Sequence, residues 1–315
     1  MRFSAAIALA LAGAAPLAAL APAPQDRPTF KAGVDRVTVT AVVQTESGQP
    51  VTGLTREDFV ILDNGRPQPI LEFRSEPTPA TVALLADFSG SMKLAGKIPV
   101  VREAAADLLA GLAPGVDRVG LFAFDTRLHE LQPIETLSED ILQHLERLRP
   151  FGSTSLYDAV SETGKVLAAD GSTRRAIVVL TDGGENSSRL SVAQVARAAS
   201  GIDVPVYIVV VLTQLDRPGL GRGEAREIAS ELASGRLGNL AHWTGGDIYL
   251  AWSAIESAEV AGRIVDELRH QYFIGFAPDT SRPGWHPIEV RTQREDLIVR
   301  ARSGYVAEDR PNSIR

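Results

Sequence analysis

Unbroken apolar runs alternate with helically spaced apolar residues through the middle of the chain. Four runs lack a polar face and are typical of strands covered on both sides: TVALLA, RVGLFAF, RAIVVL and VPVYIVVV. One helical pattern consists of Val101, Ala104, Ala105, Leu108, Leu109 and Leu112. A second lies within 256–269, and LHELQP (128–133) predicts a short antiparallel edge strand. Strands that alternate with helices predict a mostly parallel sheet with helices on both faces.

Both flanks of this region have the pattern of antiparallel strands. VDRVTVTAVVQ (34–44) alternates and is rich in β-branched residues, and 58–74 predicts two strands joined at Asn64-Gly65. After residue 270, QYFIGFAP, HPIEVRT and LIVRAR are again strand-like. We expect the terminal segments to pack together into one β layer. The predicted fold class is α/β, a doubly wound, mostly parallel sheet inserted in or flanked by a small all-β unit made from both termini.

The N-terminus predicts export. Arg2 precedes an Ala- and Leu-rich run with a Pro-rich exit, which is typical of a secretory signal peptide, with an uncleaved anchor as the alternative. No later run reaches the roughly 20 apolar residues of a membrane span, so we expect a periplasmic or extracellular protein without a stable span. The expected parts are a signal peptide (1–23), a β segment (32–77), an α/β domain (78–269), a second β segment (270–306) and a disordered tail (307–315).

Composition narrows the classes of function. The 315 residues include no cysteine, so disulfides and cysteine-ligated zinc are excluded. The histidines form no HExxH motif of zinc hydrolases. The formal net charge of -7 argues against nucleic acid as a partner.

Three stretches carry oxygen-bearing side chains where predicted strands end or helices begin. In ALLADFSGSMK, Asp87 ends a strand, and Ser89 and Ser91 follow it. Thr154 precedes a helix in FGSTSLYDAV, and Asp182 ends the strand of VVLTDGGENSS. Ligands of parallel sheets bind at the carboxyl ends of strands, and Mg²⁺ prefers oxygen ligands. These residues therefore predict one Mg²⁺ site, with Mn²⁺ or Ca²⁺ as alternative ions.

Each of these residues also has a purely structural interpretation. Ser89 and Ser91 can serve as turn residues, and Asp182 with Gly183 can form a type I or I′ turn. Three residues are candidates for the N-cap of the following helix: Ser153, Thr154 and Ser155. Asp125, which ends another strand, is interpreted as structural. The metal interpretation depends on all three stretches occurring together.

The stretches DFSGSM, GSTSLYDA and LTDGGEN together resemble the metal-ion-dependent adhesion site of von Willebrand factor type A (VWFA) domains. The family pattern of Asp-x-Ser-x-Ser, a distant Thr and a distant Asp falls on Asp87, Ser89, Ser91, Thr154 and Asp182. The resemblance covers roughly 80–270 and implies a Rossmann-like sheet. It also implies that these side chains bind Mg²⁺ directly or through water, and that a partner's carboxylate often takes the last position. The flanking segments resemble an exported bacterial subgroup, the Acidobacteria-type VWFA-related proteins.

The first functional hypothesis is a protein-binding or adhesion module that recognises an Asp or Glu carboxylate of a partner through Mg²⁺. Phe88, Met92 and Phe151 are candidate contacts at the rim of the site, with packing of the loops as the alternative. The second hypothesis is a structural scaffold, in which the metal only staples the loops together. By analogy with the family, the helix at 256–269 is the element in which to look for movement on binding.

The third hypothesis is an enzyme, and the motifs argue against it. Phosphotransfer enzymes of the haloacid-dehalogenase kind need a second carboxylate two residues after the first, where this chain has Ser89. FSGSM lacks the first glycine of the G-x-S-x-G motif of serine hydrolases. GLGRGEA has Glu224 where a dinucleotide fingerprint needs glycine. We therefore expect no catalytic residues, no organic cofactor and no enzymatic activity.

Overall fold

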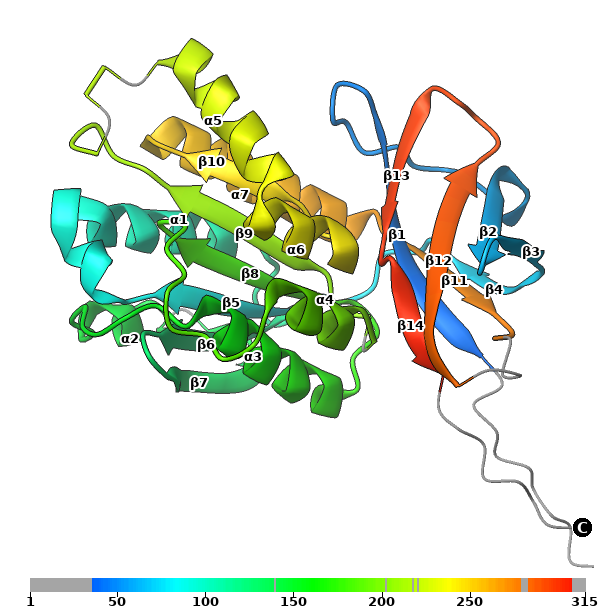
Figure 1. Cartoon of the computed structure of the whole chain (residues 1–315), viewed down its shortest axis with the longest axis horizontal. Coiled ribbons are helices and arrows are strands. Elements are labelled where there is room, and N and C mark those ends of the chain that lie inside the picture. Colours follow the sequence, from blue (N-terminus) through cyan, green and yellow to red (C-terminus); the bar gives the residue numbers. More distant parts are fainter. Residues whose placement is uncertain are drawn as a thin grey trace, which may run out of the picture. The chain divides into compact units, whose positions relative to one another are not determined.

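The α/β region is built on a sheet with the strand order β10-β9-β8-β5-β6-β7 (Figure 1). The computed structural model describes residues 36–307 except 139, 202, 217, 220 and 279–282. The expected signal peptide and residues 308–315 of the expected tail lie outside the described residues, whereas Ala307 is the last residue of a strand. The strands are β5 (Thr81–Asp87), β6 (Arg118–Phe124), β7 (Leu128–Thr136), β8 (Arg175–Thr181), β9 (Val206–Val211) and β10 (Ile248–Ala251).

The strand directions confirm the predicted sheet. β6 and β7 run antiparallel, and the other neighbouring strands run parallel. β7 is the edge strand expected at 128–133, and it continues to Thr136. The apolar runs become strands in which every residue of β5 and β9 is buried, because helices cover both faces.

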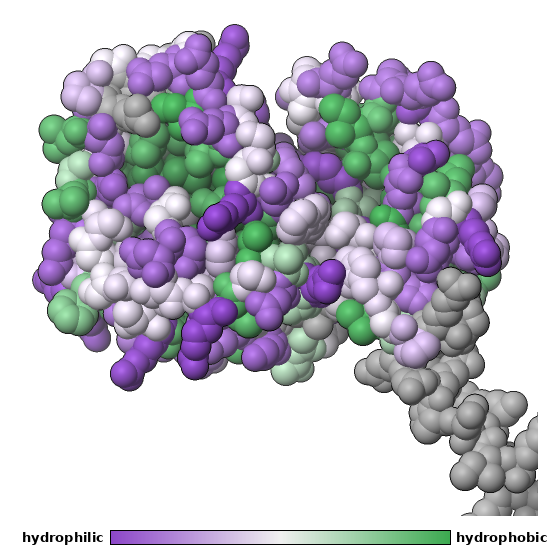
Figure 2. All heavy atoms as spheres, viewed as in Figure 1, coloured by the Kyte–Doolittle hydropathy of each residue, from purple (hydrophilic) through white to green (hydrophobic). Residues whose placement is uncertain are grey.

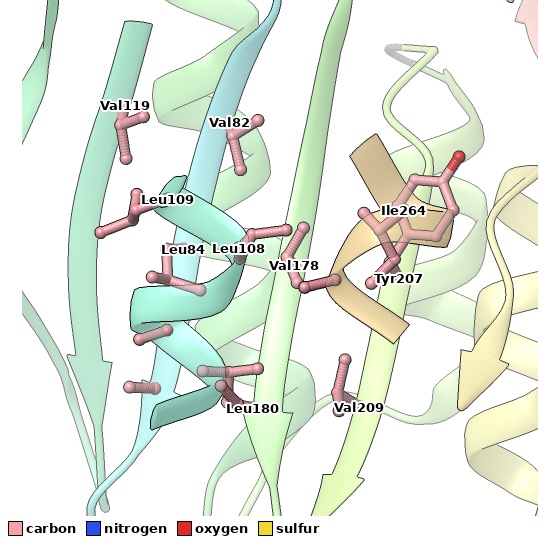
Figure 3. Packing of buried hydrophobic residues seen from close by; sticks show 14 of the residues in the cluster. Val82, Leu84, Leu108, Leu109, Val119, Val178, Leu180, Tyr207, Val209 and Ile264 are labelled. Carbon is pink, nitrogen blue, oxygen red and sulfur yellow. The ribbon is translucent and has the colours of Figure 1, made fainter. Parts of the chain in front are cut away.

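Helices α1 and α7 cover one face of the sheet, and α3, α4 and α6 cover the other. Side chains of a strand alternate between its faces, so Val82 and Leu84 pack with α1 and α7 (Figure 3), whereas Ala83 and Leu85 pack with α3. The helices are α1 (Lys97–Gly111), α2 (Gln143–Glu146), α3 (Leu156–Asp170), α4 (Val192–Gly201), α5 (Arg222–Ser234), α6 (Arg236–Thr244) and α7 (Ala254–Arg269). The helical pattern predicted over 101–112 is confirmed, since each of its apolar residues is buried against this sheet.

Strands from both flanks of the α/β region form a β unit, but it has two sheets rather than the single expected layer. One sheet has the order β13-β1-β11-β4 and the other β14-β12-β2-β3. Val39 and Ile274 of the first sheet share a core with Ile61 and Val290 of the second, so each sheet buries its apolar face on the other. The strands are β1 (Val37–Thr45), β2 (Phe59–Asp63), β3 (Arg66–Gln68), β4 (Ile70–Arg74), β11 (Tyr272–Phe276), β12 (Gly284–Thr292), β13 (Leu297–Ala301) and β14 (Gly304–Ala307).

The hairpin predicted at Asn64-Gly65 forms, but its second strand is divided. Asn64 and Gly65 have φ values of 50° and 74°, as a tight hairpin turn requires. β3 pairs with β2, whereas β4 pairs with β11 in the other sheet. The division falls at Pro69, which has no N–H to donate to a ladder.

Buried arginines connect the β unit to the α/β region within one compact unit. Arg302 donates to the backbone carbonyls of Ser200 and Thr38. Arg174, which is 1% exposed, donates to carbonyls on the segments that lead into and out of the α/β region. Its acceptors are Glu76, Thr78, Arg269 and Gln271. Across the described part of the chain, no helix is both long and apolar enough to cross a membrane.

Candidate metal centre

Two aspartates lie at the carboxyl ends of neighbouring parallel strands. Asp87 is the last residue of β5, and Asp182 directly follows β8, the parallel partner of β5. Two backbone hydrogen bonds join the loop after β5 to the loop before α3: Phe151 N–H to Phe88 O and Gly90 N–H to Gly152 O, each 2.9 Å. The three stretches found in the sequence therefore meet at the edge of the sheet where ligands of this class of fold bind.

Asp87 is a fully buried carboxylate whose hydrogen-bond donors are neutral. Its Oδ1 accepts the N–H of Ser89 at 2.9 Å, and its Oδ2 accepts the hydroxyl of Thr181 at 2.7 Å. Burial raises the pKa of Asp87 to about 6, although both hydrogen bonds oppose this, and the negative charge of Asp182 adds to the rise. A nearby cation would remove this cost of burying a charge.

The two serines lie side by side at this edge. Ser89 is buried, and its Oγ is 3.1 Å from the Oγ of Ser91. Gly90 must be glycine, because a Cβ there would lie 2.9 Å from the carbonyl oxygen of Gly152. Ser91 also helps to lower the pKa of Asp182, so the first stretch lies close to the third.

Thr154 is not the N-cap of α3. The cap residue is Ser155, whose side chain makes no capping hydrogen bond. Instead the N–H of Tyr157 donates to Glu185 Oε2 at 3.1 Å and to Ser188 Oγ at 3.0 Å, so the loop after β8 caps the helix. The sequence pattern points only to residues 153–155 as caps, because no local pattern marks a cap that comes from a loop about 30 residues away.

The hydroxyl of Thr154 instead lies close to Asp182. A Cβ built on Gly184 would be 3.1 Å from Asp182 Oδ1 and 3.6 Å from Thr154 Oγ1, so both oxygens approach one point. Asn186 holds the backbone of Thr154 by two hydrogen bonds. The N–H of Thr154 donates to Asn186 Oδ1 at 3.0 Å, and the N–H of Asn186 donates to the carbonyl of Thr154 at 3.1 Å. Gly183 lies in a bend with a φ of 86°, and the N–H of Gly184 donates to Asp182 Oδ1, so this loop directs the carboxylate.

Lys97 and Asp216 belong to the site and were missed from the sequence. Lys97 Nζ donates to Asp182 Oδ2 at 2.9 Å and lies 3.3 Å from Asp216 Oδ1. Burial would raise the pKa of Asp182, but hydrogen bonds from Lys97, Gly184 and Ser91 lower it overall. Burial would likewise lower the pKa of Lys97, yet its two carboxylate partners raise it. The site thus contains its own positive charge.

The donor set suits a hard cation. It consists of two carboxylates and three hydroxyls, all oxygen, which is the chemistry that Mg²⁺ and Ca²⁺ take in proteins. Among the described residues, no group of three or more His, Asp or Glu side chains is placed to hold a metal ion. A divalent ion would thus meet only two carboxylates of the predicted set, so an anion from outside could still be attracted.

The structure also bears on the candidate rim contacts and on Asp125. Phe88 and Met92 are buried in the core at 4% and 1% exposure, so they pack the loop and are not rim contacts. Phe151 is 73% exposed, as a rim contact would be. Asp125 is structural, since its Oδ1 accepts the N–H of Arg127 at 2.9 Å within its own turn.

Asp87→Asn should stabilise the metal-free protein at neutral pH. Because the pKa of Asp87 is raised, ionising this carboxyl opposes folding. Its contribution to the free energy of unfolding is fully present below about pH 4 and is lost as the pH rises through about 6. We expect the free energy of unfolding of Asp87→Asn to exceed that of wild type by up to about 3 kcal/mol above pH 6, and the two values to converge near pH 4. Urea unfolding with a chelator between pH 4 and 8 measures this, and a gap that does not vary with pH would contradict it.

Comparisons with known proteins agree with this geometry. Residues 82–185 match the family model described as von Willebrand factor type A domain. The search of curated proteins found no match. The chain is similar to the solved structure of the conserved hypothetical protein BatB from Bacteroides thetaiotaomicron, with 19% identity, a TM-score of 0.48, and coverage of 60% of this chain and 98% of that one.

Two other solved structures are similar over different shares of the chain. A von Willebrand factor type A protein from Catenulispora acidiphila has 12% identity and a TM-score of 0.49, covering 89% of this chain and 76% of that one. Proximal thread matrix protein 1 from the mussel byssus, described with a zinc-occupied MIDAS motif, has 14% identity and a TM-score of 0.49, covering 65% and 49%. All three TM-scores are below 0.5, so the assignment rests on the sequence match and on the observed sheet. Residues 82–185, which include β8, most of β5 and the five proposed ligands, match the von Willebrand factor type A domain.

Proposed function

We propose that this protein is an exported, divalent-metal-dependent binding module. In this proposal Asp87, Ser89, Ser91, Thr154 and Asp182 hold Mg²⁺ and leave a coordination position open to a carboxylate of a partner protein or surface. The observation that carries the proposal is the buried carboxylate of Asp87, which has neutral hydrogen-bond donors and ends β5 directly before the loop that carries Ser89 and Ser91. Such a group is costly to bury without a cation and well placed to hold one.

The surroundings of the site favour docking of a partner. Each of three nearby loops carries one exposed apolar side chain: Leu94 at 65%, Phe151 at 73% and Leu215 at 75% exposure. Figure 2 shows hydrophobic groups along the edge of the α/β region toward which β8 and β9 point in Figure 1. An acidic side chain flanked by apolar residues would complement this rim, because apolar contacts would surround the metal-bound carboxylate.

A purely stapling metal explains the site less well. The three loops are already connected by backbone hydrogen bonds, from Gly90 to Gly152 and from Asn186 to Thr154, at 2.9 Å and 3.1 Å. The loops therefore have contacts that hold them without an ion. We extend the proposal to the domain plan, with a VWFA domain over 78–269 and β segments over 32–77 and 270–306.

Metal-dependent capture of an acidic peptide tests the function. Immobilised protein should bind Glu-containing peptides with apolar neighbours when Mg²⁺ or Mn²⁺ is present, and release them when a chelator is added. The matched control replaces each Glu of the peptide by Gln, which keeps the shape and removes the charge. Equal binding of both peptides, or binding that persists in the chelator, would reject carboxylate recognition through a metal.

Thr154→Ala and Ser188→Ala should separate metal binding from helix capping. We expect Thr154→Ala to weaken Mg²⁺ binding about tenfold with little loss of stability, because its hydroxyl does not cap α3. Ser188→Ala should cost about 1 kcal/mol of stability and leave Mg²⁺ affinity unchanged, because its hydroxyl accepts the N–H of Tyr157. Calorimetric titration and urea unfolding of both variants measure this, and the reverse pattern would remove Thr154 from the site.

A further inference from the structure

Lys97 occupies an unusual position for a lysine. It is the first residue of α1, it is only 8% exposed, and its ammonium lies between Asp182 and Asp216. The residues before it, Ala95 and Gly96, both have left-handed backbones with φ values of 57° and 70°. Because an alanine in the left-handed region is strained, the turn that leads to this lysine has an unfavourable backbone energy.

Stability alone does not account for this placement. A positive charge at the N-terminal end of a helix opposes the helix dipole. Burying an ammonium is costly, and a buried ion pair is weak evidence for stabilisation. Lys97 therefore combines several unfavourable features, and what it visibly does is neutralise carboxylates beside the candidate metal centre.

Both partners of Lys97 are oriented by further hydrogen bonds. Asp216 Oδ2 accepts the N–H and the hydroxyl of Thr213 at 3.1 Å and 2.9 Å, which leaves Oδ1 toward Lys97. Asp182 Oδ1 accepts the N–H of Gly184, while Oδ2 accepts from Lys97. One oxygen of Asp182 is thus engaged by the ammonium, and the other lies on the side of Thr154.

We propose that Lys97 is a specificity-determining residue, which sets the charge of the metal-loaded site so that it accepts a carboxylate. The inference rests on the proposed function. The carboxylates of Asp87, Asp182 and Asp216 bring three negative charges and Lys97 one positive charge, so a divalent ion makes the group neutral. Without Lys97 the loaded group would be negative and would repel an acidic partner, although it would bind the metal itself more tightly.

Metal affinity and carboxylate affinity should therefore change in opposite directions. We expect Lys97→Met to bind Mn²⁺ about tenfold more tightly and acetate, on the Mn²⁺-loaded protein, about tenfold more weakly. Adding Asp216→Asn removes the charge that Lys97 balanced, so the double variant should return toward wild type in both properties. Asp216→Asn alone should bind Mn²⁺ more weakly and acetate more tightly. If Lys97→Met folds poorly, this variant still tests how the charge of the site affects the two affinities.

Water-proton relaxation with Mn²⁺ measures both affinities on the full chain. Mn²⁺ binding raises the relaxation rate, and acetate lowers it when it displaces Mn²⁺-bound water. Lys93→Met, which removes an exposed lysine four residues earlier, should change neither affinity. Weaker Mn²⁺ binding by Lys97→Met, or equal acetate binding by all variants, would overturn the role of Lys97. Absence of Mn²⁺ binding by wild type would instead overturn the proposed function, and this inference with it.

Discussion

Asp87→Ala should lower the affinity for Mg²⁺ by about 100-fold or more and leave the fold intact. The substitution removes the fully buried carboxylate at the end of β5 and also its cost of burial, so the sheet should not lose stability at neutral pH. Calorimetric titration with Mg²⁺ measures the affinity, and far-ultraviolet circular dichroism checks the fold.

A second aspartate provides the control for this experiment. Asp125 follows the neighbouring strand β6, but its carboxylate accepts hydrogen bonds within its own turn. Asp125→Ala should therefore keep the affinity for Mg²⁺ within about twofold of wild type. If Asp87→Ala binds Mg²⁺ as wild type does, the metal lies elsewhere or does not bind, and the assignment of the five ligands fails.

Arg302→Met should cost about 3 kcal/mol of the free energy of unfolding. Arg302 is 4% exposed and donates to the carbonyl of Ser200 on α4 and to that of Thr38 on β1, so it joins α4 to the β unit. Its removal takes the ion-pair partner from Asp203 and a charged donor from the carbonyls of Ser200 and Thr38. Urea unfolding measures the loss, and the Mg²⁺ affinity should not change because Arg302 makes no contact with the five proposed ligands.

An exposed arginine of the same unit supplies the comparison. Arg291 pairs with Glu289 on β12, and both side chains are more than half exposed. Because exposed ion pairs contribute little, Arg291→Met should cost less than about 1 kcal/mol. Equal losses in the two variants would mean that burial of Arg302 does not determine its contribution.

The sheet could be predicted because its evidence is local. Within a few residues, a run such as RAIVVL indicates that a strand forms, how long it is and that it is buried. Gly65 marks a turn in the same local way. The number of β layers could not be predicted in this way. Whether β4 joins β2 or β11 depends on Pro69 and on a partner strand about 200 residues away.

The five ligands could be proposed from the sequence because a spacing pattern and the positions of strand ends agreed. Their neighbours were not. Lys97 and Asp216 are 119 residues apart, and each contacts the site through tertiary structure alone. Thr181 gives a hydrogen bond to Asp87 from a different strand. Phe88 and Met92 follow the packing alternative, and the sequence could not decide this because a short loop sequence does not reveal which side chains turn inward.

Arg174 has a consequence for modularity. Its guanidinium is bonded to carbonyls on both segments that border the α/β region, so the two ends of that region are only one side chain apart. A cassette with adjacent ends can be exchanged for another without lengthening or reshaping its host. The two-sheet unit can accordingly carry a different α/β domain, inserted through the same two connecting segments.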